Sequence, residues 1–188
     1  MIGKRLTKFA NENSLTIKDE IAYGFYNGFL ITLNQHHYNI SVSFKVRIYD
    51  TPYGRKYSEI LCDHKNKVIW SVSDIVFTDS YMEIVFNDTG NTIEKVKSCI
   101  DKLTQMMQED KITSIKVCTV CGDPIDPENS GIYLNEGRAH IMNHSCVVKL
   151  NNDIAKQKRK YNCIKYRILV KMGRRKPVAI PKKIVKLK

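Results

Sequence analysis

Cysteine and histidine residues with the spacing of metal ligands gather in the second half of the chain. Cys118 and Cys121 are separated by two residues and followed by a glycine, as in a zinc knuckle, where both thiolates reach one ion from a tight turn. Cys146 follows a stretch that contains His140 and His144. Because structural zinc takes four nitrogen or sulfur ligands in a tetrahedron, this set predicts a structural Zn²⁺ site. Its predicted ligands are Cys118, Cys121, His144 and Cys146.

The fourth ligand of this site has more than one candidate. In a treble-clef zinc finger, the closing helix usually supplies ligands three residues apart, and the residue three before Cys146 is Asn143, a poor zinc ligand. His144 reaches the ion if it lies just outside the helix. We favour His144 and keep two alternatives, which are His140 and a site without histidine.

The elements expected around these residues follow the order of a treble clef. Residues 132–142 indicate a hairpin around Asn135-Glu136-Gly137, and residues 146–160 indicate a helix. A redox role for the cysteine pair would require a strand-to-helix junction within a βαβ unit, whereas Gly-Asp-Pro and a hairpin follow the pair here. The pattern therefore favours a metal over a redox pair.

An enzymatic alternative is a nuclease of the HNH type. His140 resembles the first histidine of that motif, and Asn151 or Asn152 lies at a tolerable distance from it. The helix should then supply one further metal ligand, for which only Asn162 is present, and a second cysteine pair is missing. A catalytic zinc would also need a nearby general base, and Glu136 is the only acid of the expected hairpin. We therefore expect a protein that is not an enzyme.

The positive charge of the chain is concentrated at its C-terminal end. The chain has 31 Lys and Arg against 19 Asp and Glu, a net of +12, and residues 149–188 contain 15 of these bases and one acid. Such a segment, with Tyr161 and Tyr166 interleaved, predicts nucleic-acid binding, because cations neutralise phosphates and tyrosines can stack on bases. The predicted nucleic-acid-binding residues are Lys156, Lys158, Arg159, Lys160, Lys165, Arg167, Arg174, Arg175 and Lys176.

Other partners of the basic segment stay open. An anionic membrane surface attracts the same cations, and a charge run that only keeps the protein in solution is a further interpretation of the segment. The second hypothesis for the whole protein is a protein-interaction or membrane-surface adaptor whose working surface is the α+β domain. The third is the HNH-like nuclease. No stretch approaches the roughly 20 apolar residues that cross a bilayer, and the first residues lack the long apolar run of an export signal, so we expect a cytoplasmic protein with reduced thiols.

The N-terminal part predicts an α+β fold, an antiparallel sheet with helices on one face. Asn27-Gly28 indicates a hairpin within residues 19–33, and residues 38–49 alternate as a half-buried strand. Further strands are expected at 68–77 and 81–86, and helices at about 1–12, at 55–64 and from Asn91 onward. We expect an α+β domain over 1–110, a zinc-knuckle module over 111–150 and a basic helix and tail over 151–188. Within that tail, residues 164–170 indicate a strand and the last residues a mobile end.

This layout resembles a group of uncharacterised bacterial proteins of the Firmicutes type. The resemblance rests on Tyr23 to Gly28, on the helix from Asn91, on Cys118 to Gly122 and on the stretch that ends in Cys146. It covers residues 1 to about 150 and implies an N-terminal α+β domain with a CxxCG zinc knuckle and a later HxxC pair. The expected histidine of that pair is Asn143 here, and a basic tail stands where members often continue into membrane-spanning segments. The resemblance implies no known activity.

Overall fold

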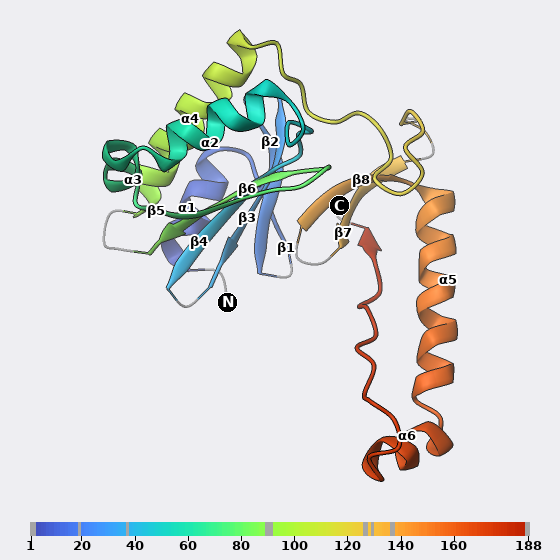
Figure 1. Ribbon diagram of the computed structural model, residues 1–188. Coiled ribbons are helices and arrows are strands. Elements are labelled where there is room, and N and C mark those ends of the chain that lie inside the picture. The colour runs from blue at the N-terminus through green and yellow to red at the C-terminus, as the bar shows by residue number, and fades with distance from the viewer. Residues whose placement is uncertain are drawn as a thin grey trace. The chain divides into compact units, whose positions relative to one another are not determined.

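The computed structural model describes residues 3–18, 20–36, 38–88, 92–125, 128, 130–135 and 138–186 (Figure 1). The chain divides into two compact units. The first contains residues 1–115 together with 137–139, and the second contains 116–136 with 140–188. Each unit has a buried apolar core of its own.

A six-stranded antiparallel sheet forms the centre of the first unit, with the strand order β1-β2-β3-β4-β6-β5. Its strands are β1 (Thr16–Lys18), β2 (Ile21–Tyr26), β3 (Phe29–Gln35), β4 (Asn39–Phe44), β5 (Val72–Phe77) and β6 (Met82–Asn87). The β2–β3 hairpin turns at Asn27 and Gly28, whose φ angles of 48° and 85° are those of a two-residue turn that favours glycine. The hairpin predicted from Asn27-Gly28 is therefore confirmed.

Four helices complete this unit, and the predicted α+β class is confirmed. They are α1 (Lys4–Glu12), α2 (Pro52–Cys62), α3 (His64–Trp70) and α4 (Thr92–Glu109). Helix α4 buries Val96, Ile100 and Leu103, at the spacing of one helical face, in the same core as alternate residues of the sheet. Asn91, the expected cap of α4, lies outside the described residues.

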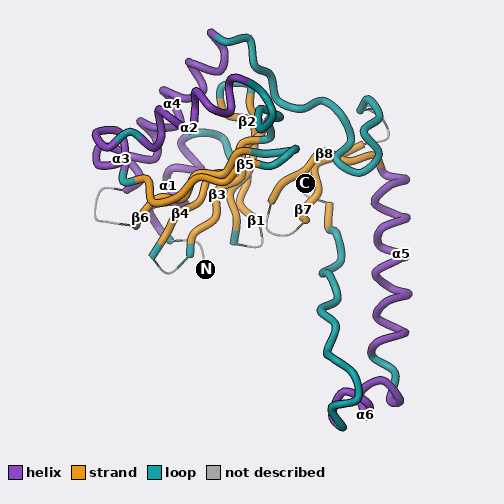
Figure 2. The backbone as a smooth tube through the Cα atoms, in the orientation of Figure 1, coloured by secondary structure: helices purple, strands orange, loops and turns teal. Residues whose placement is uncertain are grey.

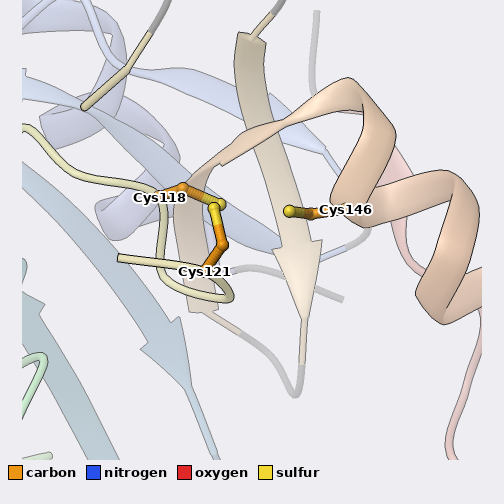
Figure 3. A group of neighbouring side chains, drawn as sticks. All are labelled: Cys118, Cys121 and Cys146. Carbon is orange, nitrogen blue, oxygen red and sulfur yellow. The ribbon is translucent and has the colours of Figure 1, made fainter. Parts of the chain in front are cut away.

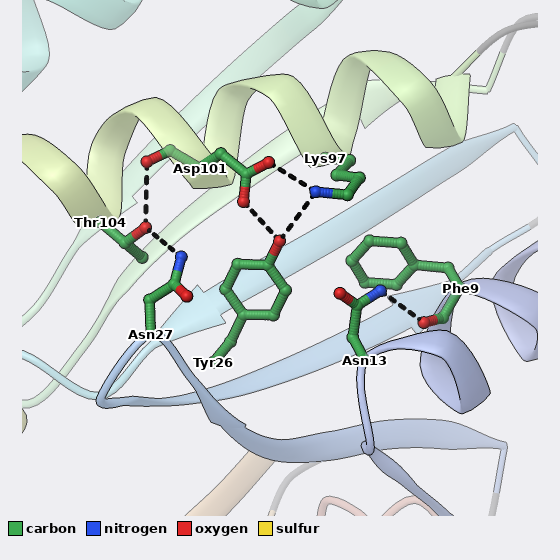
Figure 4. A network of polar contacts seen from close by, with 7 residues as sticks. All are labelled: Phe9, Asn13, Tyr26, Asn27, Lys97, Asp101 and Thr104. Atoms are coloured by element: carbon green, nitrogen blue, oxygen red, sulfur yellow. Dashed lines mark hydrogen bonds and ion pairs between the residues drawn. The ribbon is translucent and has the colours of Figure 1, made fainter.

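A polar network ties α4 to the β2–β3 hairpin (Figure 4). The hydroxyl of Tyr26 donates a hydrogen bond to Asp101, which also accepts one from Lys97 at 2.7 Å. The amide of Asn27 donates to Thr104 Oγ1 at 3.0 Å. These contacts join the hairpin to residues of α4 that are more than seventy positions away in sequence, and they hold the helix against the hairpin.

Two predictions for this unit are wrong in detail. Residues 68–70 belong to α3 and not to a strand, because Asp63 caps a short helix by accepting hydrogen bonds from the backbone N–H groups of Lys65 and Asn66. Strand β4 is buried on both faces, including Ser41 and Ser43 on the face expected to meet solvent. The alternation of polar and apolar residues shows which side chains share a face of the strand, but it does not show whether another part of the protein covers the polar face.

The second unit combines a three-stranded sheet with two helices. The sheet has the order β8-β7-β9, from β7 (Ser130–Asn135), β8 (Arg138–Asn143) and β9 (Val185–Lys186). The first two residues of β8, Arg138 and Ala139, are counted with the first unit. Helix α5 (His144–Tyr161) follows β8 directly, and α6 (Ile164–Lys171) follows α5. The chain then turns at Gly173, where φ is 68°, and runs back alongside α5 to β9 (Figures 1 and 2). The two strands of the expected hairpin are neighbours in the sheet, and the helix at 146–160 is present. The turn expected at Glu136 and Gly137 lies outside the described residues.

The C-terminal segment differs from its prediction. Residues 164–170 form a helix and not a strand, because Tyr166 packs inward at the helical period while Ile164 and Ile168 face solvent. The end of the chain is bound instead of mobile up to residue 186, since Ile184 is buried in the core of this unit and β9 pairs with β7. Residues 151–188 thus belong to the same compact unit as Cys118, Cys121 and Cys146.

Candidate metal centre

The loop that carries Cys118 and Cys121 is a tight turn held by its own backbone. The N–H of Cys118 donates to the carbonyl of Asp123 at 2.9 Å, and the N–H of Gly122 donates to the carbonyl of Cys118 at 2.9 Å. Gly122 has a φ of 77°, a left-handed conformation that glycine adopts without steric cost. The local sequence thus builds the knuckle that its spacing predicts.

Three thiols converge at this turn. The sulfur atoms of Cys118, Cys121 and Cys146 all lie within 4.8 Å of one another, and such a group could hold a metal ion. Figure 3 shows the first two on the loop, while Cys146 points toward them from the first turn of α5. In a tetrahedral zinc site with metal–sulfur bonds of about 2.3 Å, sulfur atoms stand roughly 3.8 Å apart. The thiols are therefore close to the spacing that an ion requires.

Backbone hydrogen-bond donors and neighbouring sulfur atoms give Cys118 and Cys121 different pKa values. Burial raises the pKa of Cys118, but N–H groups of Asn143, Cys121 and Val120 outweigh it and lower the pKa to about 7. The N–H of Asp123 favours the thiolate of Cys121, but the Asp123 side chain, burial and the two neighbouring sulfurs outweigh it and raise its pKa to about 11. A bound cation would stabilise the thiolate form of these cysteines, because metal binding replaces the thiol protons.

The two candidate histidines lie outside the group of converging ligand atoms that the described residues form. Nδ1 of His144 shares a hydrogen bond with the hydroxyl of Tyr133 on β7, and the two rings meet edge to face at 5.8 Å. His140 is buried within β8. The structure therefore brings three of the four predicted ligands together. The assignment of His144 as the fourth ligand stays a prediction.

Asn143 and Asn151 are two residues of this region whose roles the sequence did not indicate. Asn143 is the last residue of β8 and directly precedes α5, and its backbone N–H donates to Sγ of Cys118 at 3.4 Å. Asn151, one of the asparagines of the nuclease alternative, binds the backbone of Ile184 through its side chain. The sequence placed Asn143 three residues before Cys146, but it did not indicate the contact with Cys118. No signal in the sequence indicated the partner of Asn151.

The predicted nucleic-acid-binding residues are exposed wherever the structure describes their side chains. Lys156, Lys158, Arg159 and Lys160 lie in the last two turns of α5, Arg167 lies in α6, and Arg174, Arg175 and Lys176 follow it. The side chain of Lys165 lies outside the described part of the chain. By sequence, the second unit has 16 Lys and Arg against 5 Asp and Glu, a net of +11, and the first unit has a net of +1. The charge of the protein thus belongs to the unit that contains the thiols.

The two tyrosines of the basic segment pack on each other. Their rings meet edge to face at 5.0 Å, and Tyr166 is buried, with its hydroxyl donating to the carbonyl of Lys176 at 2.6 Å. Lys160 lies over the ring of Tyr161, and Arg175 lies over that of Tyr166. Tyr166 therefore stabilises the corner between α5 and α6, and its buried ring offers no face on which a base could stack.

None of the described helices combines the length and the apolar composition that a bilayer span requires. Comparisons with known protein families, with curated proteins and with solved structures find no significant match.

Proposed function

We propose that this protein is a zinc-stabilised, non-enzymatic nucleic-acid-binding protein that acts through its C-terminal basic segment. One observation carries the proposal: exposed cations crowd the end of α5, helix α6 and the turn after it, in the same compact unit as the three thiols. Double-stranded nucleic acid is a dense line of negative charge, and neutralising its phosphates releases bound counterions. A cation-rich helical surface is suited to that partner.

Zinc would act as a structural support for this surface. Zinc is the metal that three thiolates on a knuckle and a helix start most often bind in proteins. The ion would join the 118–121 loop to the first turn of α5 through Cys146, and α5 carries the cations at its other end. Zinc binding would therefore fix the direction of the basic helix, and it requires no chemical step.

The outer face of α5 presents its cations in register. Lys156 and Lys160 follow Lys149 by seven and eleven residues, so all three lie on one side of the helix, about 10 and 16 Å from Lys149 along its axis. The opposite side buries Val147 and Ile154. The helix is thus anchored by one face and presents the other to a polyanion.

The side chains available on this surface favour binding to phosphates over reading of bases. The cations are long, exposed side chains, and Tyr166 is committed to the interior of the unit. Phosphate contacts position a protein on nucleic acid without specifying its sequence. We therefore expect binding that depends weakly on sequence and steeply on salt.

Fluorescence anisotropy on a short labelled duplex tests this function. A triple alanine variant of Lys156, Arg159 and Lys160 should bind at least tenfold more weakly, and its salt slope should fall by about 0.9 for each phosphate that it no longer neutralises. The matched control replaces Lys8, Lys65 and Lys102, which are exposed in the first unit, and so removes the same charge. Equal weakening by both variants would show a non-specific charge effect and would overturn the proposal.

An anionic membrane surface is the second candidate partner, and one feature of α6 favours it. Ile164, Ile168 and Met172 follow one another at four-residue spacing and are 76%, 50% and 56% exposed. The exposed cations Arg167 and Lys171 lie beside this apolar stripe. An apolar stripe flanked by lysine and arginine is typical of helices that lie at a membrane interface.

Vesicle flotation separates the second candidate from the first. If the stripe inserts into lipid, replacing Ile164 and Ile168 by serine should abolish binding to anionic vesicles and leave duplex binding unchanged. Val148→Ser is the matched control, because Val148 is an exposed apolar residue on α5 outside the stripe. Absence of binding to anionic vesicles by the unmodified protein would remove this candidate.

A further inference from the structure

The three converging thiols differ in how far solvent reaches them. Cys121 is exposed and Cys146 is partly exposed, whereas Cys118 is 1% exposed. A dissolved oxidant therefore meets the sulfur of Cys121 first. Cysteines that serve as oxidation sites in proteins are accessible to solvent and often have a second thiol beside them that reacts with the oxidised sulfur. Cys121 meets the first of these two conditions.

The second condition is met by Cys118, which shares a tight turn with Cys121. The N–H of Gly122 donates to the carbonyl of Cys118 at 2.9 Å, and the sulfur atoms of both cysteines lie within 4.8 Å of each other. Cα atoms at the two ends of a four-residue turn stand less than about 7 Å apart, and a disulfide spans about 4.4 to 6.8 Å between Cα atoms. A disulfide between these two residues therefore fits the loop as it is folded.

Cys146 belongs to a different element of the same unit. It lies in the first turn of α5 and points toward the loop (Figure 3). A disulfide within the loop would remove two of the three thiolates, and the thiolate is the form of cysteine that binds metal. The metal would then no longer join the loop to α5. The N–H of Cys118 would keep its bond to the carbonyl of Asp123, so the loop would keep its turn.

We propose that Cys118 and Cys121 form an oxidation site, at which a hydroperoxide closes a disulfide and thereby releases the metal. The sulfur of Cys121 attacks one oxygen of the peroxide, the O–O bond breaks, and the other oxygen leaves as water or an alcohol. The sulfur of Cys118 then attacks the sulfenic acid on Cys121, the S–O bond breaks, and the hydroxyl leaves as water. Two electrons pass from the two sulfurs to the peroxide.

In the metal-bound form the two sulfurs carry no protons. The two protons that the leaving oxygens need then come from solvent, and the ion departs as Zn²⁺. This regulation rests on the proposed metal site and the proposed nucleic-acid binding. It makes the orientation of α5 depend on the redox state of the loop, and it differs from a thioredoxin-type role because the pair oxidises no other protein.

Cys163 provides a comparison within the same unit. It is also exposed, and its thiol donates to the carbonyl of Lys160 at 3.1 Å, but it lies outside the group of converging sulfurs that the described residues form. Peroxide should therefore take Cys163 to a sulfenic acid without an internal disulfide. Exposure alone does not supply a second thiol.

Hydrogen peroxide added to the zinc-loaded full chain tests the proposal. It should release one zinc per chain to a colorimetric chelator, and peptide mass spectrometry should find the Cys118–Cys121 disulfide. The oxidised protein should bind zinc at least about a hundredfold more weakly, because even the loss of one supporting group at a metal site costs 10- to 100-fold. Dithiothreitol followed by zinc should restore the reduced form.

Two variants assign the order of the thiols. Cys121→Ser should slow the loss of the Cys118 thiol to peroxide at least about tenfold, because the accessible sulfur is gone and Cys118 is buried. Cys163→Ser is the matched control, since it also removes an exposed thiol, and it should leave zinc release and the disulfide unchanged. Far-UV circular dichroism confirms that each variant is folded.

Four results would overturn the proposal: a purified protein that binds no zinc, zinc that stays bound after peroxide, a disulfide that joins Cys146 in place of the loop pair, or equally fast loss of the Cys118 thiol in Cys121→Ser. Duplex binding is measured separately in both redox states. Oxidation should weaken it at least about threefold, because the basic helix then keeps its binding orientation for a smaller fraction of the time. Equal binding in both states would overturn the regulatory role alone, and no binding in either state would count against the nucleic-acid function and not against the oxidation site.

Discussion

The side chain of Asn151 pairs with the backbone of Ile184 in both directions. Its Nδ2 donates to the carbonyl of Ile184 at 3.1 Å, and its Oδ1 accepts from the N–H of Ile184 at 2.9 Å. The amide of asparagine, like that of glutamine, carries a donor and an acceptor side by side. It can therefore satisfy both the N–H and the C=O of a backbone residue as another strand would. This pair therefore fixes the returning C-terminal segment against α5 just before β9 begins.

Asn151→Ala should release this segment. Two part-buried hydrogen bonds are removed, and each contributes about 0.5 to 1.5 kcal/mol, so local stability should fall by about 1 to 3 kcal/mol. Hydrogen exchange at the amide of Ile184 measures the effect as a gain in exchange rate of at least about tenfold. Asn152→Ala is the control, because Asn152 is exposed and one residue away. Unchanged protection of Ile184 in Asn151→Ala would contradict the role given to the pair.

The sequence predicted the elements whose signals are local. Asn27-Gly28 demands a two-residue turn, and the apolar stripe of α4 repeats at the helical period over eighteen residues, so both were found where expected. Residues 164–170 were misassigned because Ile164 and Ile168 fit both a strand of period two and a helix of period four. Only the packing of Tyr166 against Tyr161 decides between them, and that packing is tertiary.

The metal site was predictable to the same extent. The spacing of Cys118 and Cys121 determines a tight loop, and that loop is present. The return of Cys146 to it depends on the hairpin between them, whose outline the sequence also indicated. The position of Asn143 beside Cys121 and the hydrogen bond between Tyr133 and His144 depend on the geometry of the junction between β8 and α5. The residue types in the sequence do not predict that geometry.

Tyr26→Phe should destabilise the first unit. The hydroxyl of Tyr26 donates to the carboxylate of Asp101, and burial, with the nearby carboxylate, raises the pKa of the phenol and keeps it protonated. A hydrogen bond to a charged group contributes about 1.5 to 3 kcal/mol, and the loss should lie near the lower value because Asp101 keeps its bond to Lys97. Urea unfolding measures the change, with Tyr49→Phe, at an exposed tyrosine, as the control. Equal stability of the two variants would rule out the contribution assigned to this bond.

Asp110 should make the stability of the protein depend on acidity. Hydrogen bonds from Lys56 and Tyr57 lower the pKa of Asp110 below its ordinary 3.8. A carboxyl whose pKa is lower when folded stabilises the fold above its unfolded pKa, and this contribution is lost as the pH falls through the folded value. Asp110→Asn should therefore be less stable at neutral pH, and the difference should shrink as the pH falls from about 5 to about 2.

Urea unfolding across this pH range checks the prediction for Asp110. Asp79→Asn is the control, because Asp79 is exposed on the turn between β5 and β6. A difference in stability between Asp110→Asn and the unmodified protein that does not change with pH would show that the ion pair does not shift the pKa of Asp110.

Removal of metal should destabilise the second unit alone. A ligand that binds only the folded state adds RT ln(1 + [L]/Kd), about 4 kcal/mol when zinc is present at a thousand times its dissociation constant. A chelator should therefore speed hydrogen exchange in α5 and β7 and leave the core of the first unit, around Ile100, unchanged. Cys118→Ser should reproduce the chelator effect and abolish the response to added zinc, because it removes one of three converging thiols.

Cys62→Ser is the matched control for the metal prediction. Cys62 is also a free thiol, but it lies at the end of α2 in the first unit, outside the group of converging sulfurs. The variant should keep the zinc content and the zinc-dependent protection of the unmodified protein. If Cys62→Ser lost zinc as Cys118→Ser does, the metal would be bound elsewhere. If neither variant nor the chelator changed the protection of α5, the knuckle would hold its shape through its backbone hydrogen bonds alone, and a structural metal would have no part in orienting the basic helix.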